Sequence, residues 1–102
     1  MLECRVHQMM NNLPQLGSGS ATDTKAAINI AGIPSGPLEQ GVYILHATSS
    51  AVDEMRVYCD AVSATSYAIL GKGDTLFLPV TDLTKIKVAT ASGTATYSIV
   101  AY

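Results

Sequence analysis

The sequence predicts an all-β fold: a single antiparallel β-sandwich domain, jelly-roll-like or closed into a barrel, that carries an N-terminal arm. From residue 25 onward, apolar and polar residues alternate with a period of two, which is typical of strands with one buried face. Gly, Pro, Ser and Asp interrupt this alternation at the short intervals expected of sandwiches and barrels. No stretch of helical length has an apolar stripe with a period of 3.6 residues. At 102 residues the chain is long enough for one core.

Residues 1–24 are predicted to form the N-terminal arm, and residues 25–102 the β domain. Residues 17–20 are Gly-Ser-Gly-Ser, a composition typical of a flexible joint. The apolar side chains that precede this joint must be covered by their own domain or by a neighbouring molecule; they are Met9, Met10, Leu13 and Leu16. Residues 4–8 equally suit a first strand inside the domain, and a strand donated to a neighbour would satisfy both interpretations.

Seven strands are predicted within the β domain. They cover residues 25–31, 42–47, 55–62, 66–70, 75–80, 85–91 and 94–102. In the third of these, Met55 and Val57 alternate with charged and polar residues, so one face is expected to be buried and the other wet. In the second, residues 42–45 are Val-Tyr-Ile-Leu, which makes both faces apolar. We therefore expect the second strand to lie centrally, or against the arm or another subunit.

The last two strands are predicted to pair as a hairpin around a two-residue Ser-Gly turn at 92–93. Counting back from this turn pairs Val88 with Tyr97 and Ile86 with Ile99. These apolar pairs share one face, while the opposite face brings mostly polar residues together. A slip of one residue would destroy this agreement.

The charge and the composition exclude several classes of partner. The formal net charge is -2 and the six basic residues are scattered, so nucleic acid is not expected as a main ligand. The longest apolar runs have four residues, far fewer than a signal peptide or a membrane span needs, so no membrane contact is expected. Charged residues make up 14%, against about 25% in average soluble domains. Such a weakly charged surface favours burial against partners.

The sequence contains no catalytic or metal-binding motif. His7 and His46 do not lie at metal-ligand spacing, and no serine or cysteine stands in a nucleophile motif. Cys4 and Cys59 can pair only if the fold brings them together, and we expect both to be reduced. We therefore expect no enzymatic activity, no cofactor and no metal, and no small-molecule substrate. A metal enzyme or hydrolase would need these histidines and cysteines to converge.

The apolar arm, the low charge and the strand-rich end of the chain together resemble small virion proteins of tailed bacteriophages. That end is Leu-Thr-Lys-Ile-Lys-Val at 83–88 and Gly-Thr-Ala-Thr-Tyr-Ser-Ile-Val-Ala-Tyr at 93–102. The likeness is to capsid decoration or cement proteins, and to some neck and fibre components. It implies a non-enzymatic structural protein of the virion, assembled in the host cytoplasm, that binds viral coat protein subunits as a dimer or trimer. By the same resemblance, the docking residues would be Met9, Met10, Leu13 and Leu16.

A carbohydrate or receptor-binding β module is the main alternative. Such a module, for example a fibre or neck component, would bind through the loops at residues 48–53 and 71–75, which the predicted strands place at one end of the sandwich. Binding of the isolated protein to a glycan array would favour this alternative over the structural one.

Overall fold

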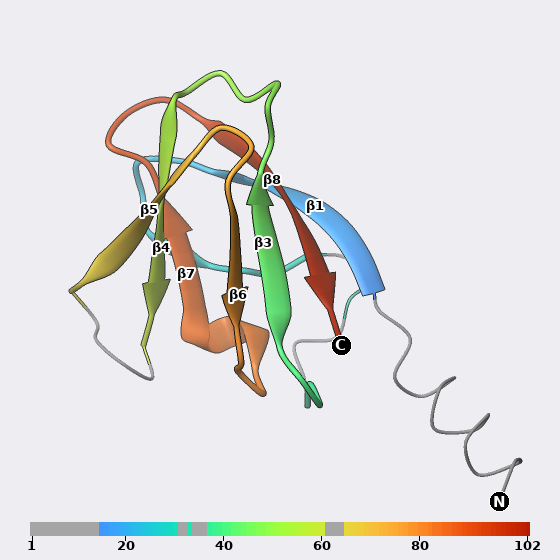
Figure 1. Cartoon of the computed structure of the whole chain (residues 1–102). Coiled ribbons are helices and arrows are strands. Elements are labelled where there is room, and N and C mark those ends of the chain that lie inside the picture. The colour runs from blue at the N-terminus through green and yellow to red at the C-terminus, as the bar shows by residue number, and fades with distance from the viewer. Residues whose placement is uncertain (1–14, 31–32, 34–36, 61–64) are drawn as a thin grey trace, which may run out of the picture.

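The computed structural model describes residues 15–30, 33, 37–60 and 65–102, which form two antiparallel four-stranded sheets. Sheet A has the order β1 (Gln15–Ala21), β8 (Ala95–Ala101), β3 (Val42–His46) and β6 (Thr75–Leu78). Sheet B has the order β2 (Ala26–Ala27), β7 (Ile86–Ala89), β4 (Glu54–Cys59) and β5 (Tyr67–Gly71). A short 3-10 turn, η1 (Leu83–Lys85), precedes β7. In Figure 1 the strands of sheet A stand to the right of β4, β5 and β7.

The strand order is that of a jelly roll. Strand β1 pairs with β8, β2 with β7, β3 with β6 and β4 with β5, so the chain is folded in half at the β4–β5 connection. The resulting double ribbon is wrapped into two facing sheets, which is the jelly-roll architecture. The prediction of an all-β, jelly-roll-like sandwich is confirmed.

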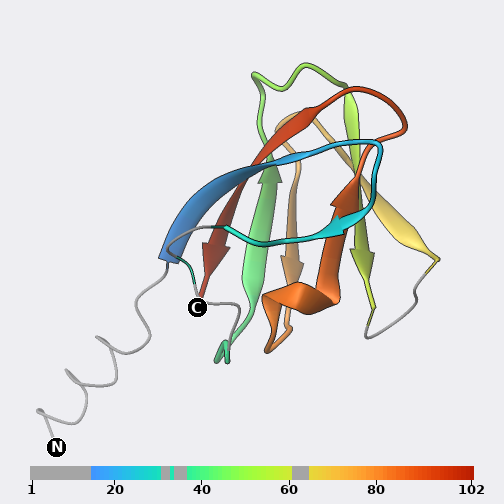
Figure 2. The same cartoon turned by 180° about the vertical axis from the view of Figure 1, so that it is seen from behind.

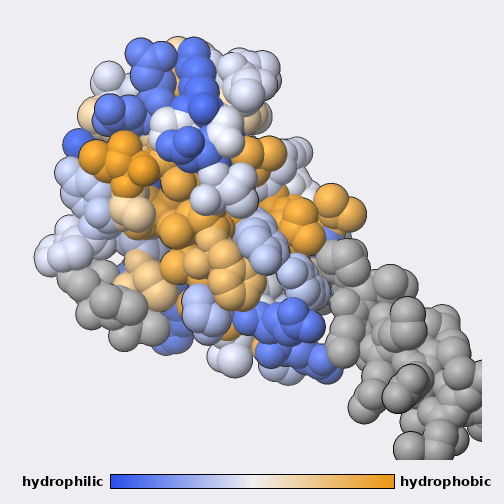
Figure 3. All heavy atoms as spheres, in the orientation of Figure 1, coloured by the Kyte–Doolittle hydropathy of each residue, from blue (hydrophilic) through white to orange (hydrophobic). Residues whose placement is uncertain are grey.

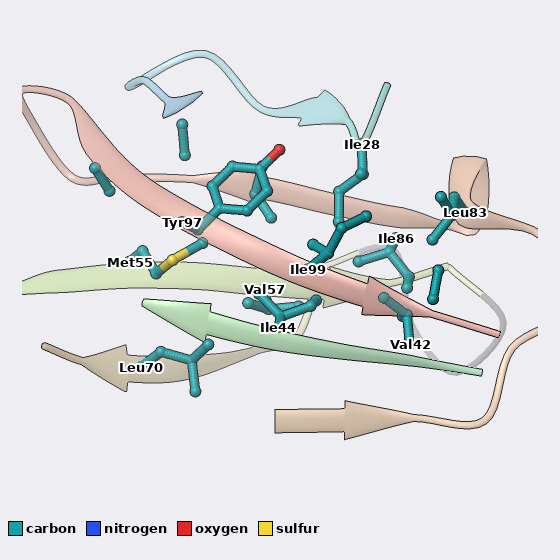
Figure 4. Close-up of a cluster of buried hydrophobic side chains, with 14 residues drawn as sticks. Ile28, Val42, Ile44, Met55, Val57, Leu70, Leu83, Ile86, Tyr97 and Ile99 are labelled. Carbon is teal, nitrogen blue, oxygen red and sulfur yellow. The ribbon is translucent and has the colours of Figure 1, made fainter. Parts of the chain in front are cut away.

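The core lies between the two sheets and takes one face from each strand. Figure 4 shows these inward side chains meeting, with Tyr97 and Ile99 of β8 on one side and Met55 and Val57 of β4 on the other. Each fully buried large apolar side chain stabilises the fold by about 1.5 to 3 kcal/mol relative to its exposed state. The largest side chains that are fully buried are Ile28, Ile44, Met55, Leu83, Ile86, Ile99, His46 and Val42.

The prediction that residues 42–47 form a central strand is confirmed, and the alternation predicted for residues 55–62 is confirmed except at Tyr58. Strand β3 lies between β8 and β6, buries Val42 and Ile44, and turns Tyr43 outward. In β4, Met55 is buried as predicted. Tyr58 differs, because it lies on the predicted wet face and is nevertheless only 9% exposed.

The prediction of a flexible joint at residues 17–20 is wrong. These residues belong to β1, which pairs with β8 over its whole length, from Gln15 opposite Ala101 to Ala21 opposite Ala95. The glycines fit here because their inward positions lie against the core: a Cβ on Gly19 would stand 2.8 Å from the hydroxyl oxygen of Tyr97. Residues 1–14 lie outside the described residues, so the arm itself stays a prediction.

The predicted hairpin between the last two strands is also wrong. Strand β7 pairs with β4 in sheet B, whereas β8 pairs with β1 and β3 in sheet A. The intervening residues form a corner between the sheets, in which Gly93 has a φ of 78° and its carbonyl accepts a hydrogen bond of 2.7 Å from the Thr90 hydroxyl. The apolar residues assigned to one hairpin face do lie toward one core, but from opposite sheets.

Candidate functional site

The described strands of sheet A place no carboxylate, ammonium or guanidinium group on its outer face. None of the residues in its four described strands is Asp, Glu, Lys or Arg, and the histidine of β3 points into the core. All charged residues of the described strands lie in sheet B, in β4 and β7. An uncharged sheet face does not repel another apolar surface and loses little hydration when it is covered.

Strand pairing aligns four apolar residues into one row across this face. Val100 of β8 stands opposite Leu16 of β1 on one side and Tyr43 of β3 on the other, and Tyr43 stands opposite Phe77 of β6. We call Leu16, Val100, Tyr43 and Phe77 the apolar row. Leu16 is 74% exposed, and Tyr43 and Phe77 are each 39% exposed. Leu45 adds a further apolar side chain beside the row, also 39% exposed.

The aromatic side chains of the row hold each other in place. The ring centroids of Tyr43 and Phe77 lie 4.7 Å apart, and those of Tyr43 and Tyr102 lie 6.1 Å apart in a stacked arrangement. A hydrogen bond with the Tyr43 side chain raises the pKa of Tyr102, and burial raises it further. The cluster is therefore partly ordered before any partner binds, which lowers the entropy that binding would cost.

The outer face of sheet B has the opposite character. The Lys25 ammonium lies 4.6 Å from the centroid of the Tyr58 ring, and the Arg56 guanidinium lies 4.7 Å from that of Tyr67. The two rings also contact each other, with centroids 5.2 Å apart. These contacts explain the burial of Tyr58, and they place cations over aromatic rings that would otherwise face water.

Two of the pockets in the described part of the chain lie beside the edge strands of the sandwich. A groove of about 450 Å³ lies between β1 and β2 and is lined largely by backbone and small side chains. A second, more apolar pocket of about 270 Å³ lies between β5 and β6, and its lining includes Cys59, Leu76 and Leu78. Figure 3 shows hydrophobic side chains gathered over β5 and β6 on that side of the molecule. Neither pocket brings together groups that could perform acid-base or nucleophilic chemistry.

The structure places the residues with potential chemistry apart from one another. His46 is fully buried at the end of β3, and its Nδ1 donates a hydrogen bond of 2.9 Å to the Leu70 carbonyl. Asp53 lies in a loop, with its carboxylate 3.5 Å from the Lys72 ammonium. Within residues 15–30, 33, 37–60 and 65–102, no three His, Cys, Asp or Glu side chains are grouped to hold a metal ion. Cys4 and His7 lie outside the described residues.

Only one of the four predicted docking residues falls within the described part of the chain. Leu16 is on the outer face of β1, where it begins the apolar row. Met9, Met10 and Leu13 lie outside the described residues. The sequence analysis missed Phe77 and Val100 as members of this surface. The available signal was the two-sided apolar pattern of residues 42–45, but the register with β6 and β8 is needed to find the other members.

No family model matches the chain, and no curated protein matches it either. Among solved structures, it is similar to a protein of Salmonella typhimurium LT2 assigned as ethanolamine utilization protein Q, with 14% identity and a TM-score of 0.56. That match covers 93% of this chain and 62% of the other, so the chain spans less than two thirds of the Salmonella protein. It is also similar to a subunit of Bacillus endospore appendages, which form disulfide-linked pili, with 15% identity, a TM-score of 0.50 and coverage of 86% and 81%. These likenesses show a shared β-sandwich fold. The described residues contain no helix long and apolar enough to cross a membrane.

Proposed function

We propose that this protein is a non-enzymatic structural subunit that binds its neighbours in a larger assembly through the outer face of sheet A. The observation that carries the proposal is the apolar row, which crosses a four-stranded face without Asp, Glu, Lys or Arg in its strands. Apolar residues aligned in this way mark interaction surfaces on soluble domains more often than scattered ones do.

The energy of this contact favours an assembly of many copies over a tight pair. Covering the exposed part of each of Leu16, Tyr43, Leu45 and Phe77 contributes about 1 kcal/mol, or about 4 kcal/mol in total. Association of two proteins costs about 4 kcal/mol or more, because translational and rotational freedom is lost. One such contact is therefore weak. Contacts repeated around a shell or along a fibre add up, because each bound copy holds the next position at high effective concentration.

The particular assembly that we propose is a bacteriophage virion, in which the chain decorates or cements the capsid by apolar contacts to neighbouring coat subunits. The resemblance of the sequence to small virion proteins supports it, and the proposal includes a location in virions that assemble in the host cytoplasm. In this proposal Met9, Met10 and Leu13 extend the contact beyond Leu16, the docking residue that begins the apolar row. The Bacillus appendage subunit gives an example of a similar fold in a repetitive assembly.

A carbohydrate or receptor-binding module is the second candidate, and the aromatic pair of sheet B favours it. Tyr67 is 42% exposed and packs against Tyr58, so it offers part of an aromatic ring to a sugar. Arg56 already lies over the Tyr67 ring, which reduces the free stacking surface. This candidate is therefore ranked below the structural one.

The proposal is tested by the mass of the particle that contains the chain in its native cell. Full-length protein with a tag is purified from that cell and sized by sedimentation. Wild-type protein should sediment far above its own 10.7 kDa, and Phe77→Lys should sediment as free protein because a charge now interrupts the apolar row. The matched control is Ile69→Lys, which places the same charge at an exposed edge-strand position on the outer face of sheet B and should stay in the particle.

Two results would refute the proposal. One is wild-type protein that is free in the cell, and the other is release by Ile69→Lys with retention of Phe77→Lys. Circular dichroism of each variant establishes that the β domain is folded. Electron microscopy of the particle then decides between a coat shell and another assembly.

A further inference from the structure

The four described sheet edges differ in how well they are protected against pairing with another strand. Strand β2 has two residues, and β6 has four and ends directly before Pro79. Strand β5 has Arg56 over its first residue, Tyr67, and Lys72 directly after its last. Short strands, prolines and charges are the devices that prevent edge-to-edge pairing.

Strand β1 has none of these devices within it, although Pro14 directly precedes its first residue in the sequence. It is seven residues long, Gln-Leu-Gly-Ser-Gly-Ser-Ala, with no charged residue and no proline. Packing explains why residues 17 and 19 are glycines, since a Cβ on either would stand within 3 Å of a core side chain. Ser18 and Ser20 are exposed on the outer face, where a lysine or glutamate would fit and would protect the edge.

On the side of β1 that faces away from β8, no strand of the described residues pairs with it. Within the described part of the chain, the backbone hydrogen bonds of β1 go to β8, and β1 is the end strand of sheet A. The groove of about 450 Å³ borders this edge, from Gly17 to Ala21. Figure 2 shows β1 crossing the front of the molecule, with β2 and the segment that follows it running below β1. About half of the backbone N–H and C=O groups of β1 therefore point to this unpaired side, as in any edge strand.

We propose that β1 of a second copy of this chain pairs antiparallel with β1 about a two-fold axis. The contact joins two sheets A into one continuous sheet with four strands from each copy. A two-fold contact brings identical side chains together near the axis, and an uncharged strand does so without like-charge repulsion. The second strand would lie at the usual spacing of about 4.8 Å, because strand side chains project above and below the sheet and leave the backbone edge accessible.

This contact goes beyond the proposed function, because it uses the edge of sheet A and needs no coat protein. It also enlarges the proposed binding surface. The two apolar rows then lie on the same outer face of one sheet, and Leu16 of each copy is near the junction. A repeating partner would meet a surface about twice as large as one chain offers.

The test measures self-association of the purified full-length chain by sedimentation equilibrium at low salt, up to millimolar concentration. Wild-type protein should shift from 10.7 kDa toward twice that mass. Ser18→Lys and Ser18→Glu should each weaken self-association at least ten-fold, because like charges meet across the axis. An equal mixture of the two variants should restore it, since opposite charges then meet. Thr75→Lys is the matched control, an exposed position on the same face at the opposite edge of sheet A.

Hydrogen exchange gives a second readout that a general change in charge would not alter. Amides of β1 should become more protected as the wild-type concentration rises, while those of β6 should not. The proposal is overturned if wild-type protein stays a monomer at every concentration, or if Ser18→Lys associates as tightly as wild type. Loss of association in Thr75→Lys equal to that in Ser18→Lys, or no recovery in the mixture, would also overturn it.

Discussion

The outer faces of the two sheets both carry a pair of aromatic residues, but they differ in whether cations lie over the aromatic rings. Each has two large aromatic side chains in register on neighbouring strands, Tyr43 with Phe77 in sheet A and Tyr58 with Tyr67 in sheet B. In sheet B, cations lie over both rings; Tyr58 is only 9% exposed, whereas Tyr67 on the edge strand is 42% exposed. In sheet A no cation covers the rings within the described residues, and both stay 39% exposed.

This difference separates stability from binding. An aromatic residue that is covered by its own chain buries its apolar surface on folding and so stabilises the fold. One that is left exposed still has apolar surface that a partner can bury, and it can therefore stabilise binding. Lys87, which extends from sheet B to bond Asp60, also makes that side of the molecule hydrophilic. Sheet B thus supplies the charged surface that keeps the protein dissolved, and sheet A supplies the surface that we propose to be covered.

The largest expected effect comes from truncating the covered aromatic of sheet B. Tyr58→Ala should lower the free energy of unfolding by about 2 to 3 kcal/mol, because it removes a buried ring together with its contacts to Tyr67 and Lys25. Tyr43→Ala should cost about 1 kcal/mol, since that ring is already partly exposed. Urea denaturation of both variants measures the difference. Equal losses of unfolding free energy in the two variants would show that the rings of the two faces contribute equally to stability, contrary to this comparison.

The next effect tests whether the glycines of β1 belong to sheet A. Gly19→Val should lower the free energy of unfolding by about 2 kcal/mol, because the new Cβ would lie 2.8 Å from the Tyr97 hydroxyl in the core. Ser18→Val is the control, since residue 18 is exposed and a β-branched residue suits a strand. Thermal unfolding followed by circular dichroism would distinguish them. Unchanged stability of Gly19→Val would mean that β1 is not packed as described.

The smallest effect concerns acid stability on the charged side. The hydrogen bond from Lys87, with 2.9 Å between Nζ and Oδ2, lowers the pKa of Asp60 from its ordinary value of 3.8. A lowered pKa in the folded state means that this carboxylate stabilises the protein above pH 3.8 and loses that contribution as the pH falls through the folded-state pKa. Asp60→Asn should lower the melting temperature by at most about 4 °C at pH 7.

The difference between wild type and Asp60→Asn should shrink as the pH falls below 3.8. A melting-temperature series from pH 7 to pH 2 measures it. A difference that stays constant over that range would show that the ion pair is not its source. Association through the apolar row, which contains no Asp, Glu, Lys or Arg, should in contrast be insensitive to pH between 5 and 8, a range set by the ordinary pKa values of side chains.

The positions of the strands could be predicted because the alternation of apolar and polar residues is a local signal. Strands β3, β5, β6, β7 and β8 begin and end within two residues of the predicted ranges, and β4 ends three residues before its predicted end. Their pairing could not be predicted in the same way. Ile86 and Ile99 both point to the core, and this pattern is the same whether their strands are neighbours in one sheet or face each other across two. In a jelly roll, most successive strands change sheets, so the nearest strand in sequence is often the wrong partner.

The predictions of strand β1 and of the binding surface failed for a related reason. The composition of residues 17–20 is typical of linkers, and only pairing with β8 and the close approach of Tyr97 make it a strand. Similarly, the pattern of residues 42–45 indicated a second apolar face, but Phe77 joins it through a register that spans more than thirty residues of sequence. Local composition therefore indicated one strand of the surface and could not delimit the rest.

The place of β8 between β1 and β3 has a consequence for synthesis on the ribosome. Both of these strands leave the exit tunnel well before their common neighbour, which is the last described strand to be made. Until residues 95–101 emerge, β1 has no partner and β3 can pair only with β6. Sheet A consequently closes late and in one step, and a nascent chain cut before that segment would expose an unpaired β1 and one unpaired edge of β3 to aggregation and to chaperones.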